Sequence, residues 1–292
     1  MQRLTCMLLE CGATIHEINT LRKHLSRFSG GSLVRAAFPA TVLGLIVSDV
    51  VGDDLDVIAS GPTVPDPSTF ADCLRVVEHY GLRWKMPQSI WAHIEGGLQG
   101  RTPETPKADE PAFGRVRNVL VASVKQALEA AADEAARCGF VPRILTTAMS
   151  GEARRTAAQL VAEARRAQAG LRPGDAPLCL LAGGETTVTI RGSGKGGRNQ
   201  EMALAATLEL ADDRGIDLIC VGTDGTDGPT DAAGGYAFSG DLARLRAIGL
   251  HPKESLDAND SYPLLLKAGT LLRTGPTRTN VMDMAIMLVR PK

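Results

Sequence analysis

The 292-residue chain lacks several features that would place it in a specialised class of protein. Aromatic residues make up only 4% of it, which argues against base-stacking surfaces and against carbohydrate-stacking platforms. The formal net charge is -1, so the sequence as a whole offers no electrostatic attraction for nucleic acid or an anionic membrane. No apolar run approaches the roughly 18 residues that a membrane-spanning helix needs. We therefore expect neither a nucleic-acid partner nor a membrane partner.

Cysteine is present six times, but no two cysteines form a C-x-x-C pair. Cys179 and Cys220 lie in apolar runs, a position typical of core thiols. The N-terminal stretch MQRLTCMLLECGATIHEI also lacks the apolar segment and the small-residue cleavage site of a signal peptide. The sequence therefore predicts a cytoplasmic protein whose cysteines are reduced.

Motifs of several enzyme classes are absent as well. No G-x-S-x-G is present, so a nucleophile of the α/β-hydrolase type is unsupported. No two histidines have the H-x-x-x-H spacing, which leaves no case for a histidine-held metal. A nicotinamide fingerprint, G-x-G-x-x-G in a first strand-to-helix turn, is not found either.

What is present is an alternation of apolar runs with helical patterns. The run at residues 42–47 is continuously apolar, which is typical of a strand buried on both faces of a parallel sheet. Residues 99–111 are polar and rich in proline, and we expect them to form a linker. Beyond them, strands and helices alternate regularly, and residues 177–190 predict two strands joined by a glycine turn. The length and this pattern predict two three-layer α/β domains with mostly parallel sheets, residues 1–111 and 112–292.

Two helix starts can be predicted from local pattern alone. Thr14 precedes an amphipathic stretch and has Glu17 three residues later, which is the pattern of a capping box. Pro67, Ser68 and Thr69 precede the stretch ADCLRVVEHYGL and predict a second helix start there.

The densest cluster of glycines lies at residues 181–201, LAGGETTVTIRGSGKGGRNQE. Gly183 and Gly184 allow the backbone to turn sharply after an apolar strand. Further glycines alternate with Lys195 and Arg198 before a predicted helix. Exposed N–H groups, cationic side chains and a helix N-terminus together favour an anion site suited to phosphate. The spacing is not that of a Walker loop, because a glycine follows Lys195, and a solvated hairpin is the alternative interpretation.

Aspartates gather in two glycine-containing loops. Asp224, Asp227 and Asp231 follow a predicted strand, where carboxylates can hold Mg²⁺, orient a hydroxyl nucleophile or accept its proton. Turns that cap the next helix in the chain are the alternative there. The earlier loop at residues 48–66 could be purely structural, or four of its aspartates, Asp49, Asp53, Asp54 and Asp56, could supply metal or hydroxyl ligands. Ser60 and Gly61 lie in its tight turn.

Taken together, five stretches resemble the type-2 glycerate kinases, the family with a C-terminal MOFRL domain, of which many members are labelled hydroxypyruvate reductase. The stretches run from near the first residue to near the last. They are IHEINTLRKHLSRFSGG, SDVVGDDLDVIASGPTVPDPSTF, LLAGGETTVTIRGSGKGGRNQEMAL, GTDGTDGPTDAAG and LLRTGPTRTNVMDMAIMLV.

The resemblance implies ATP-dependent phosphorylation of D-glycerate at its 2-hydroxyl, with Mg²⁺. It implies two α/β domains with the active site in the cleft between them. The expected partners are a nucleotide and D-glycerate, and a homodimer stays open. Phosphoryl transfer requires positioning and charge neutralisation more than covalent chemistry, which agrees with the residue types present.

The resemblance also implies roles for individual residues. Arg198 would stabilise the transferring phosphoryl group or bind the glycerate carboxylate. Asp224 and Asp227 would engage the substrate hydroxyl or Mg²⁺, with Asp231 as a further metal ligand. The positions bordering the nucleotide or substrate would be Asp49, Ser60, Gly61, Gly183, Gly184, Glu185, Lys195, Gly196 and Gly197.

One departure from the family pattern concerns the N-terminus. Family members are longer there and carry a catalytic lysine in a nucleotide-fold half, followed by a serine- and glycine-rich loop; neither motif occurs here. We therefore expect a truncated chain or a wrong start, an incomplete N-terminal domain and an exposed sheet edge. Two alternatives remain. One is an NAD(P)H-dependent hydroxypyruvate reductase, which would need a nicotinamide-binding motif that this sequence lacks. The other is a non-catalytic, anion-binding remnant.

Overall fold

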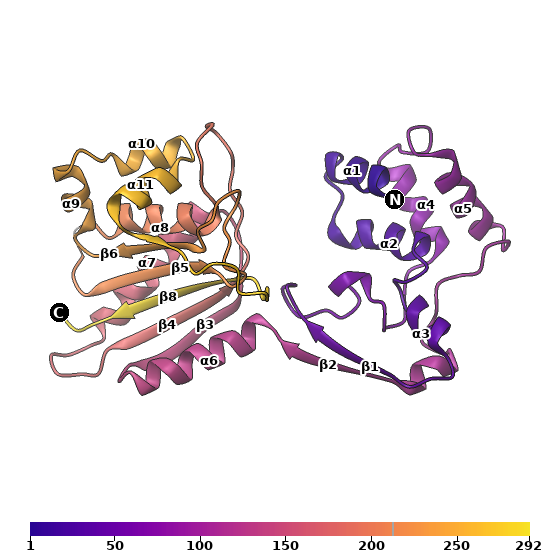
Figure 1. The fold of residues 1–292 in the computed structure, drawn as a ribbon, viewed down its shortest axis with the longest axis horizontal. Helices are drawn as coiled ribbons and strands as arrows, with labels where there is room; N and C mark the ends of the chain where they lie inside the picture. Colours follow the sequence, from indigo (N-terminus) through magenta and orange to yellow (C-terminus); the bar gives the residue numbers. More distant parts are fainter. Residues whose placement is uncertain (212) are drawn as a thin grey trace. The chain divides into compact units, whose positions relative to one another are not determined.

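The structure, a computed structural model, describes residues 1–211 and 213–292. The chain divides into two compact units. Unit 1 comprises residues 1–46 and 53–121, and unit 2 comprises residues 47–52 and 122–292. The boundary predicted between residues 111 and 112 lies slightly earlier in the chain than the last boundary between the units, which falls between residues 121 and 122. Figure 1 follows the chain from the indigo N-terminus to the yellow C-terminus.

Unit 1 is built mainly from helices that pack around a core of their own. Thr14 and Glu17 form the predicted capping box at the start of the second helix. Leu8, Leu21 and Ile94 are fully buried in this core. The helices are α1 (Gln2–Glu10), α2 (Ile15–Leu25), α3 (Ser32–Ala37), α4 (Phe70–His79) and α5 (Gln88–Leu98).

The sheet of unit 1 has two strands, β1 (Val42–Val47) and β2 (Val116–Ala122). Figure 1 shows the two arrows pointing the same way. Alternate residues of β1 are exposed, Leu43 by 61% and Leu45 by 66%, so the prediction of burial on both faces is wrong. Among the described residues only β2 pairs with β1, and one apolar face stays uncovered.

Residues 99–111 do not form the predicted linker, because they pack onto unit 1. The Glu104 carboxylate accepts a hydrogen bond from the Phe70 backbone N–H at 2.8 Å. The Lys107 amine donates to the Asp66 carbonyl at 3.0 Å, and Thr105 is buried. The polar side chains that suggested a solvated linker therefore bond to protein groups.

Replacing Thr69 with alanine tests the second predicted helix start. The Thr69 hydroxyl accepts from the Asp72 N–H at 3.3 Å, and the Asp72 carboxylate accepts from the Thr69 N–H at 2.7 Å, which completes a capping box on α4. We expect Thr69→Ala to lower the free energy of unfolding by about 1 kcal/mol in a urea titration. Thr69→Ser keeps the hydroxyl and should change little; an equal loss in both variants would contradict this role.

Unit 2 contains a six-stranded sheet with the order β3-β4-β8-β5-β6-β7. The α/β class is confirmed, but only β3 and β4 pair in parallel. β8 lies between β4 and β5 and pairs antiparallel to both, so those two strands run the same way without touching. The expected parallel pairing of β4 with β5 does not form, because β8, a later strand in the chain, lies between them. The strands are β3 (Val141–Met149), β4 (Leu178–Gly184), β5 (Ile216–Gly222), β6 (Gly234–Phe238), β7 (Leu271–Leu272) and β8 (Asp283–Val289).

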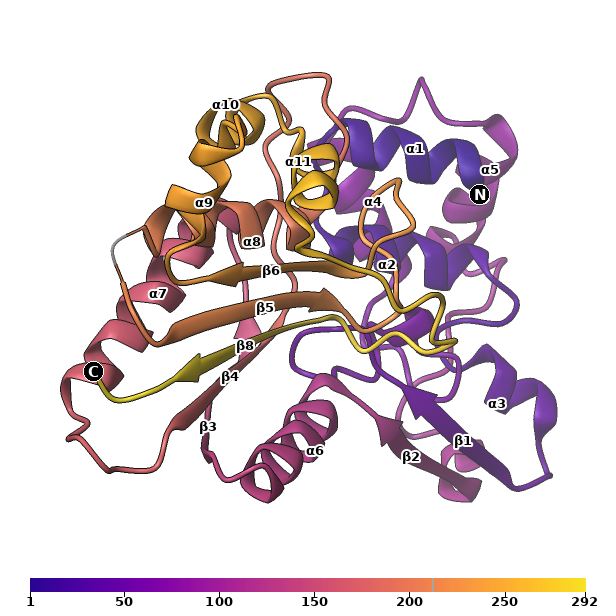
Figure 2. The ribbon, with the colours of Figure 1, turned by 60° about the vertical axis from the view of Figure 1, so that its left-hand side comes forward.

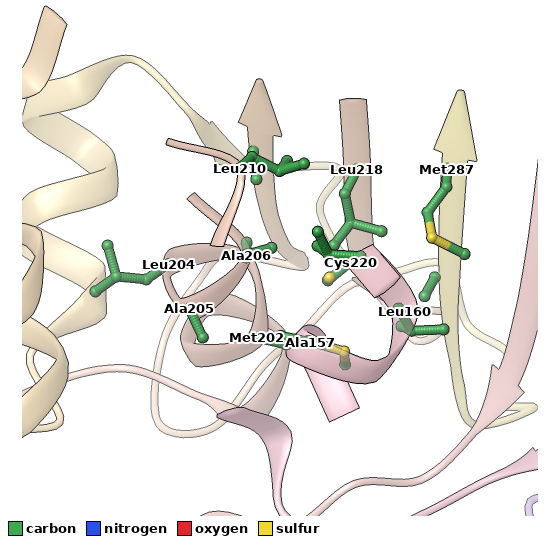
Figure 3. Packing of buried hydrophobic residues seen from close by; sticks show 14 of the residues in the cluster. Ala157, Leu160, Met202, Leu204, Ala205, Ala206, Leu210, Leu218, Cys220 and Met287 are labelled. Carbon is green, nitrogen blue, oxygen red and sulfur yellow. The ribbon is translucent and has the colours of Figure 1, made fainter. Parts of the chain in front are cut away.

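Helices cover both faces of this sheet, which gives the three predicted layers. Along β4, Leu180 packs in one apolar cluster with residues of α7 and α8, and Leu181 packs in another with residues of α6. Figure 3 shows part of the first cluster, with Leu218 and Cys220 of β5 and Met287 of β8. The helices are α6 (Val124–Arg137), α7 (Ala153–Ala169), α8 (Arg198–Glu209), α9 (Asp241–Ala247), α10 (Pro252–Asp257) and α11 (Ser261–Ala268).

The predicted core thiols are confirmed: Cys179 and Cys220 are buried and unpaired. Burial raises the pKa of both thiols, so they stay protonated at neutral pH. A bilayer-crossing helix would have to be long and strongly apolar, and no helix formed by residues 1–211 or 213–292 is both.

Candidate active site

The glycine-rich segment between β4 and α8 lies beside the turn that joins α10 to α11 (Figure 2). The Asn259 side-chain oxygen accepts from the N–H groups of Arg191 and Gly192, at 2.7 and 3.0 Å. The strand predicted over residues 185–190 does not form; Thr187 makes only an isolated bridge to Glu152. Hydrogen bonds to a distant side chain therefore take the place of strand pairing in this segment.

The glycines in this segment allow close contact with the rest of the chain. A Cβ atom at Gly192 would lie 2.3 Å from the Ala258 carbonyl oxygen, and one at Gly196 would lie 2.1 Å from the Ser261 hydroxyl oxygen. Gly184 has a φ of +149°, and a Cβ there would lie 2.1 Å from the Met149 carbonyl oxygen. The glycines that suggested a phosphate loop therefore have an internal packing reason to be glycine.

Asp227 occupies the N-terminus of α8. Its Oδ1 accepts from the backbone and side-chain N–H groups of Asn199, at 3.0 and 3.3 Å. Its Oδ2 accepts from the backbone and side-chain N–H groups of Gln200, at 2.8 and 2.9 Å. The backbone N–H groups that were expected to receive phosphate thus bind a carboxylate of the protein itself.

The environment of Asp227 acts on its pKa in both directions. Burial raises the pKa of this carboxyl group, the hydrogen bonds from Asn199 and Gln200 lower it, and the nearby charge of Asp283 raises it. The net direction is upward. A Cβ atom at Gly197 would lie 2.3 Å from the Asp227 side-chain carbon Cγ, so glycine is required beside it.

Arg198, the first residue of α8, is held between two carboxylates. Its Nε and Nη2 donate to the two oxygens of Asp283 at 2.5 and 3.0 Å, which is a bidentate pair. Its Nη1 donates to Glu185 at 2.5 Å. The Asp283 side chain is only 1% exposed, whereas that of Glu185 is 47% exposed. Asp283 therefore fixes the guanidinium from inside, and Glu185 contacts it from the solvent side.

These contacts keep Arg198 charged. Burial alone lowers its pKa, but the hydrogen bonds to Asp283 and the charges of Asp283 and Glu185 raise it overall. Asp283 is a site residue that the sequence reasoning missed. Its position directly before the apolar run MAIMLV could have pointed to it. A buried carboxylate there is costly unless it is paired, so such a residue indicates a cationic partner.

The other predicted site residues of this loop region have separate partners. Asp224 accepts from the backbone N–H and the hydroxyl of Thr226, both at 2.9 Å. Asp231 accepts from the Tyr262 hydroxyl at 2.6 Å and pairs with Arg273 at 3.3 Å. The Lys195 amine lies 4.5 Å from the centroid of the Tyr262 ring.

The three aspartates therefore do not come together as one ligand set. Asp224 and Asp227 each use their carboxylates in turns or helix capping, and Asp231 is paired with a tyrosine and an arginine. Among residues 1–211 and 213–292, no group of three or more acidic, histidine or cysteine side chains is placed to hold a metal ion.

A cavity of about 550 Å³ opens beside Arg198 within unit 2. Arg198 and Glu185 form part of its wall, together with the apolar side chains of Val188, Ile190 and Pro229. Buried Glu201 also lines it and is held by Arg154 at 2.6 Å and by Asn259 at 2.8 Å. The cavity combines an apolar surface with one cationic side chain, an arrangement typical of small-molecule sites.

The candidates from the earlier loop have different surroundings. Asp49 is exposed just after β1. Ser60 and Gly61 belong to unit 1 and both have a φ of 61°, in the left-handed region. The buried Ser60 hydroxyl donates to the Asn19 side-chain oxygen at 2.8 Å. Such strain in a non-glycine residue needs support, which Asn19 and its neighbours supply.

A buried ion-pair cluster lies close to this loop in unit 1. The Lys23 amine is 2.8 Å from a carboxylate oxygen of Asp56 and 3.5 Å from one of Asp66. The Lys23 and Asp66 side chains are 4% and 0% exposed. Lys23 lies on α2, and nothing local in the sequence indicates these distant partners.

Comparison with known families agrees with the two units. Residues 1–95 match a family described as "Domain of unknown function (DUF4147)", and residues 178–283 match the MOFRL family. The second match includes the cavity-lining segment, Arg198 and Asp283.

Individual relatives extend the similarity over nearly the whole chain. The glycerate 2-kinase of Pyrococcus horikoshii is 47% identical over 99% of this chain and 64% of that protein. The D-glycerate 2-kinase of Thermotoga maritima is 45% identical over 99% of this chain and 66% of that protein. The chain thus spans just under two thirds of the length of these curated relatives.

A solved structure shows that the similarity includes the fold. The crystal structure of glycerate kinase from Thermotoga maritima superposes with a TM-score of 0.89 at 45% identity. The match covers 99% of this chain and 67% of that one. The chain, with its MOFRL segment around Arg198, belongs to the glycerate kinase family.

Proposed function

We propose that the protein transfers a phosphoryl group from ATP to the 2-hydroxyl of D-glycerate and so forms 2-phosphoglycerate. The observation that carries this proposal is the Arg198 guanidinium, which a buried bidentate carboxylate holds at the wall of a ligand-sized cavity. Similarity to proteins named glycerate 2-kinase supports it. A fixed guanidinium can stabilise the charge of a transferring phosphoryl group or bind the glycerate carboxylate.

In this proposal the chain's residues act mainly by positioning. Asp283 orients Arg198, and Asp227 fixes the first turn of α8, from which Arg198 projects. Asp224 stays a candidate for engaging the substrate hydroxyl. The proposal keeps nine positions as neighbours of nucleotide or substrate: Asp49, Ser60, Gly61, Gly183, Gly184, Glu185, Lys195, Gly196 and Gly197.

Mg²⁺ enters the proposal only as a companion of the nucleotide. The carboxylates of Asp224, Asp227 and Asp231 do not form a ligand set, so we assign no protein-held metal to them. We also propose a reducing compartment such as the cytoplasm, because the six cysteines are unpaired. A homodimer stays a prediction.

The test is a product assay on the purified chain. We expect ATP, Mg²⁺ and D-glycerate to give 2-phosphoglycerate, identified by ³¹P NMR, which also distinguishes the 3-phosphorylated isomer. Circular dichroism on the same sample checks that the protein is folded. Folded protein that forms no phosphoglycerate above an enzyme-free control would overturn the proposal for this chain. In a parallel assay with hydroxypyruvate, NADH consumption would favour the reductase alternative.

A further inference from the structure

The glycine-rich segment at residues 185–197 forms most of the cavity wall without belonging to a strand. Glu185 is its first residue, and Arg198 directly follows its last. Arg191 and Lys195 are exposed, so solvent reaches the segment along much of its length. An exposed segment outside the sheet keeps one conformation only where other groups of the protein bond to its backbone.

The turn between α10 and α11, together with the first residues of α11, supplies such groups. The Ala258 carbonyl accepts from the Gly194 N–H at 3.0 Å. The Asp260 carboxylate accepts from the Lys195 N–H at 2.9 Å, and the Lys195 carbonyl accepts from the Tyr262 N–H at 2.9 Å. The far half of the segment is therefore bound to this turn residue by residue.

Asn259 binds the near half through both ends of its side-chain amide. The oxygen accepts from the N–H groups of Arg191 and Gly192 at 2.7 and 3.0 Å. The NH₂ group donates to the Thr189 carbonyl at 3.3 Å and to the Glu201 carboxylate at 2.8 Å. Asn259 is 8% exposed, and its φ of +53° lies in the left-handed region, which asparagine tolerates better than most residues. The amide thus uses both donors and both acceptor sites.

Glu201 and Arg154 determine which way this amide faces. One carboxylate oxygen of Glu201 accepts from Asn259, and the other accepts from Arg154 Nε at 2.6 Å. Arg154 Nη2 also donates to the Leu256 carbonyl at 2.5 Å, which ties it to α10. A carboxylate has no donor, so the NH₂ group of Asn259 has to face Glu201 and its oxygen has to face the segment.

We propose that Asn259 is a positioning residue of the active site, oriented by the Arg154–Glu201 ion pair and acting through the backbone of residues 189–192. Without its amide, this part of the segment leaves the turn, and the cavity loses part of its wall. The effect on the segment is independent of the reaction. The effect on turnover rests on the proposed kinase function.

Limited trypsin digestion of the full chain, followed by mass spectrometry, measures how often the segment opens, because Arg191 and Lys195 are exposed cleavage sites within it. Asn259→Asp keeps the side-chain shape and an acceptor oxygen, but it removes the donor and sets a second carboxylate against Glu201. We expect cleavage after both residues to be about tenfold faster than in the wild type. Asn259→Gly, which keeps the left-handed backbone, should show the same increase.

Combining Asn259→Asp with Glu201→Gln separates positioning from packing, because both changes keep the side-chain shape. The amide introduced at position 201 donates to the new carboxylate and still accepts from Arg154, so the hydrogen bond is restored with its direction reversed. We expect cleavage to return to within about twofold of the wild-type rate. Asn280→Asp is the matched control, at an exposed residue that accepts from the Met282 N–H at 3.0 Å, and should leave cleavage unchanged.

Wild-type cleavage rates in Asn259→Asp and Asn259→Gly would overturn the proposal, and so would a double variant that is cleaved as fast as Asn259→Asp. Circular dichroism verifies that each variant is folded. On the same samples, we expect 2-phosphoglycerate formation to fall about tenfold in Asn259→Asp and to recover in the double variant. An unchanged rate in Asn259→Asp would remove the positioning role.

The digestion contains no nucleotide and no glycerate, so it is independent of turnover. The expected cleavage pattern in a chain that forms no product would refute only the kinase proposal. Product formation without the expected cleavage pattern would refute the role of Asn259 alone.

Discussion

Replacing Arg198 with alanine is expected to reduce the rate of 2-phosphoglycerate formation at least tenfold. The variant removes the cationic side chain that the cavity presents to an anionic ligand. It also leaves the buried Asp283 carboxylate without its bidentate partner. We therefore expect the free energy of unfolding to fall by about 1 to 3 kcal/mol, measured by urea titration alongside the assay.

The two effects of this substitution can be separated. Arg198→Ala combined with Asp283→Asn removes the unpaired buried charge and should recover part of the lost stability but none of the lost rate. Arg166→Ala, at an exposed pair on α7, is the control and should change neither quantity. A normal turnover rate in Arg198→Ala would remove this residue from the site.

Replacing Asp227 with alanine is expected to lower the free energy of unfolding by about 2 to 4 kcal/mol. Four N–H groups of Asn199 and Gln200 would lose their acceptor in a buried place. Asp227→Asn should also be destabilised, because one carboxylate oxygen becomes an NH₂ group facing donors. Urea denaturation at pH 7 measures both variants.

Asp224→Ala is the matched control for this prediction. Its carboxylate makes only a local turn with Thr226, so we expect a loss below about 1 kcal/mol. Equal losses of unfolding free energy at the two positions would show that Asp227 does not cap α8 in solution.

Because Arg198 is the first residue of α8, Asp227→Ala should also impair turnover through displacement of the Arg198 side chain.

Features that depend on neighbours in the sequence were predictable. The capping box of Thr14 and Glu17 follows from two residues three apart in the chain, and the helix start at Thr69 follows from the run Pro67, Ser68 and Thr69. The alternation of apolar runs with helical patterns likewise predicted the α/β layers of unit 2. These signals are local, and the structure confirms them.

Features that depend on distant partners were not predictable from pattern. Asp227 was a candidate for capping the helix that follows it, but it caps α8, which precedes it in the chain. Asp283 meets Arg198 across 85 residues of sequence, so no spacing rule connects them. The position of β8 between β4 and β5 similarly depends on tertiary packing, and it converts an expected parallel sheet into a mixed one.

The central position of β8 has a consequence for synthesis of the chain. β4 and β5 leave the ribosome well before residues 283–289, and each lacks the partner strand that joins them. Until that strand is made, both present unpaired backbone edges beside apolar side chains such as Leu181 and Ile219. The sheet of unit 2 therefore cannot be completed until β8 has been made, and the nascent chain is exposed to aggregation until then.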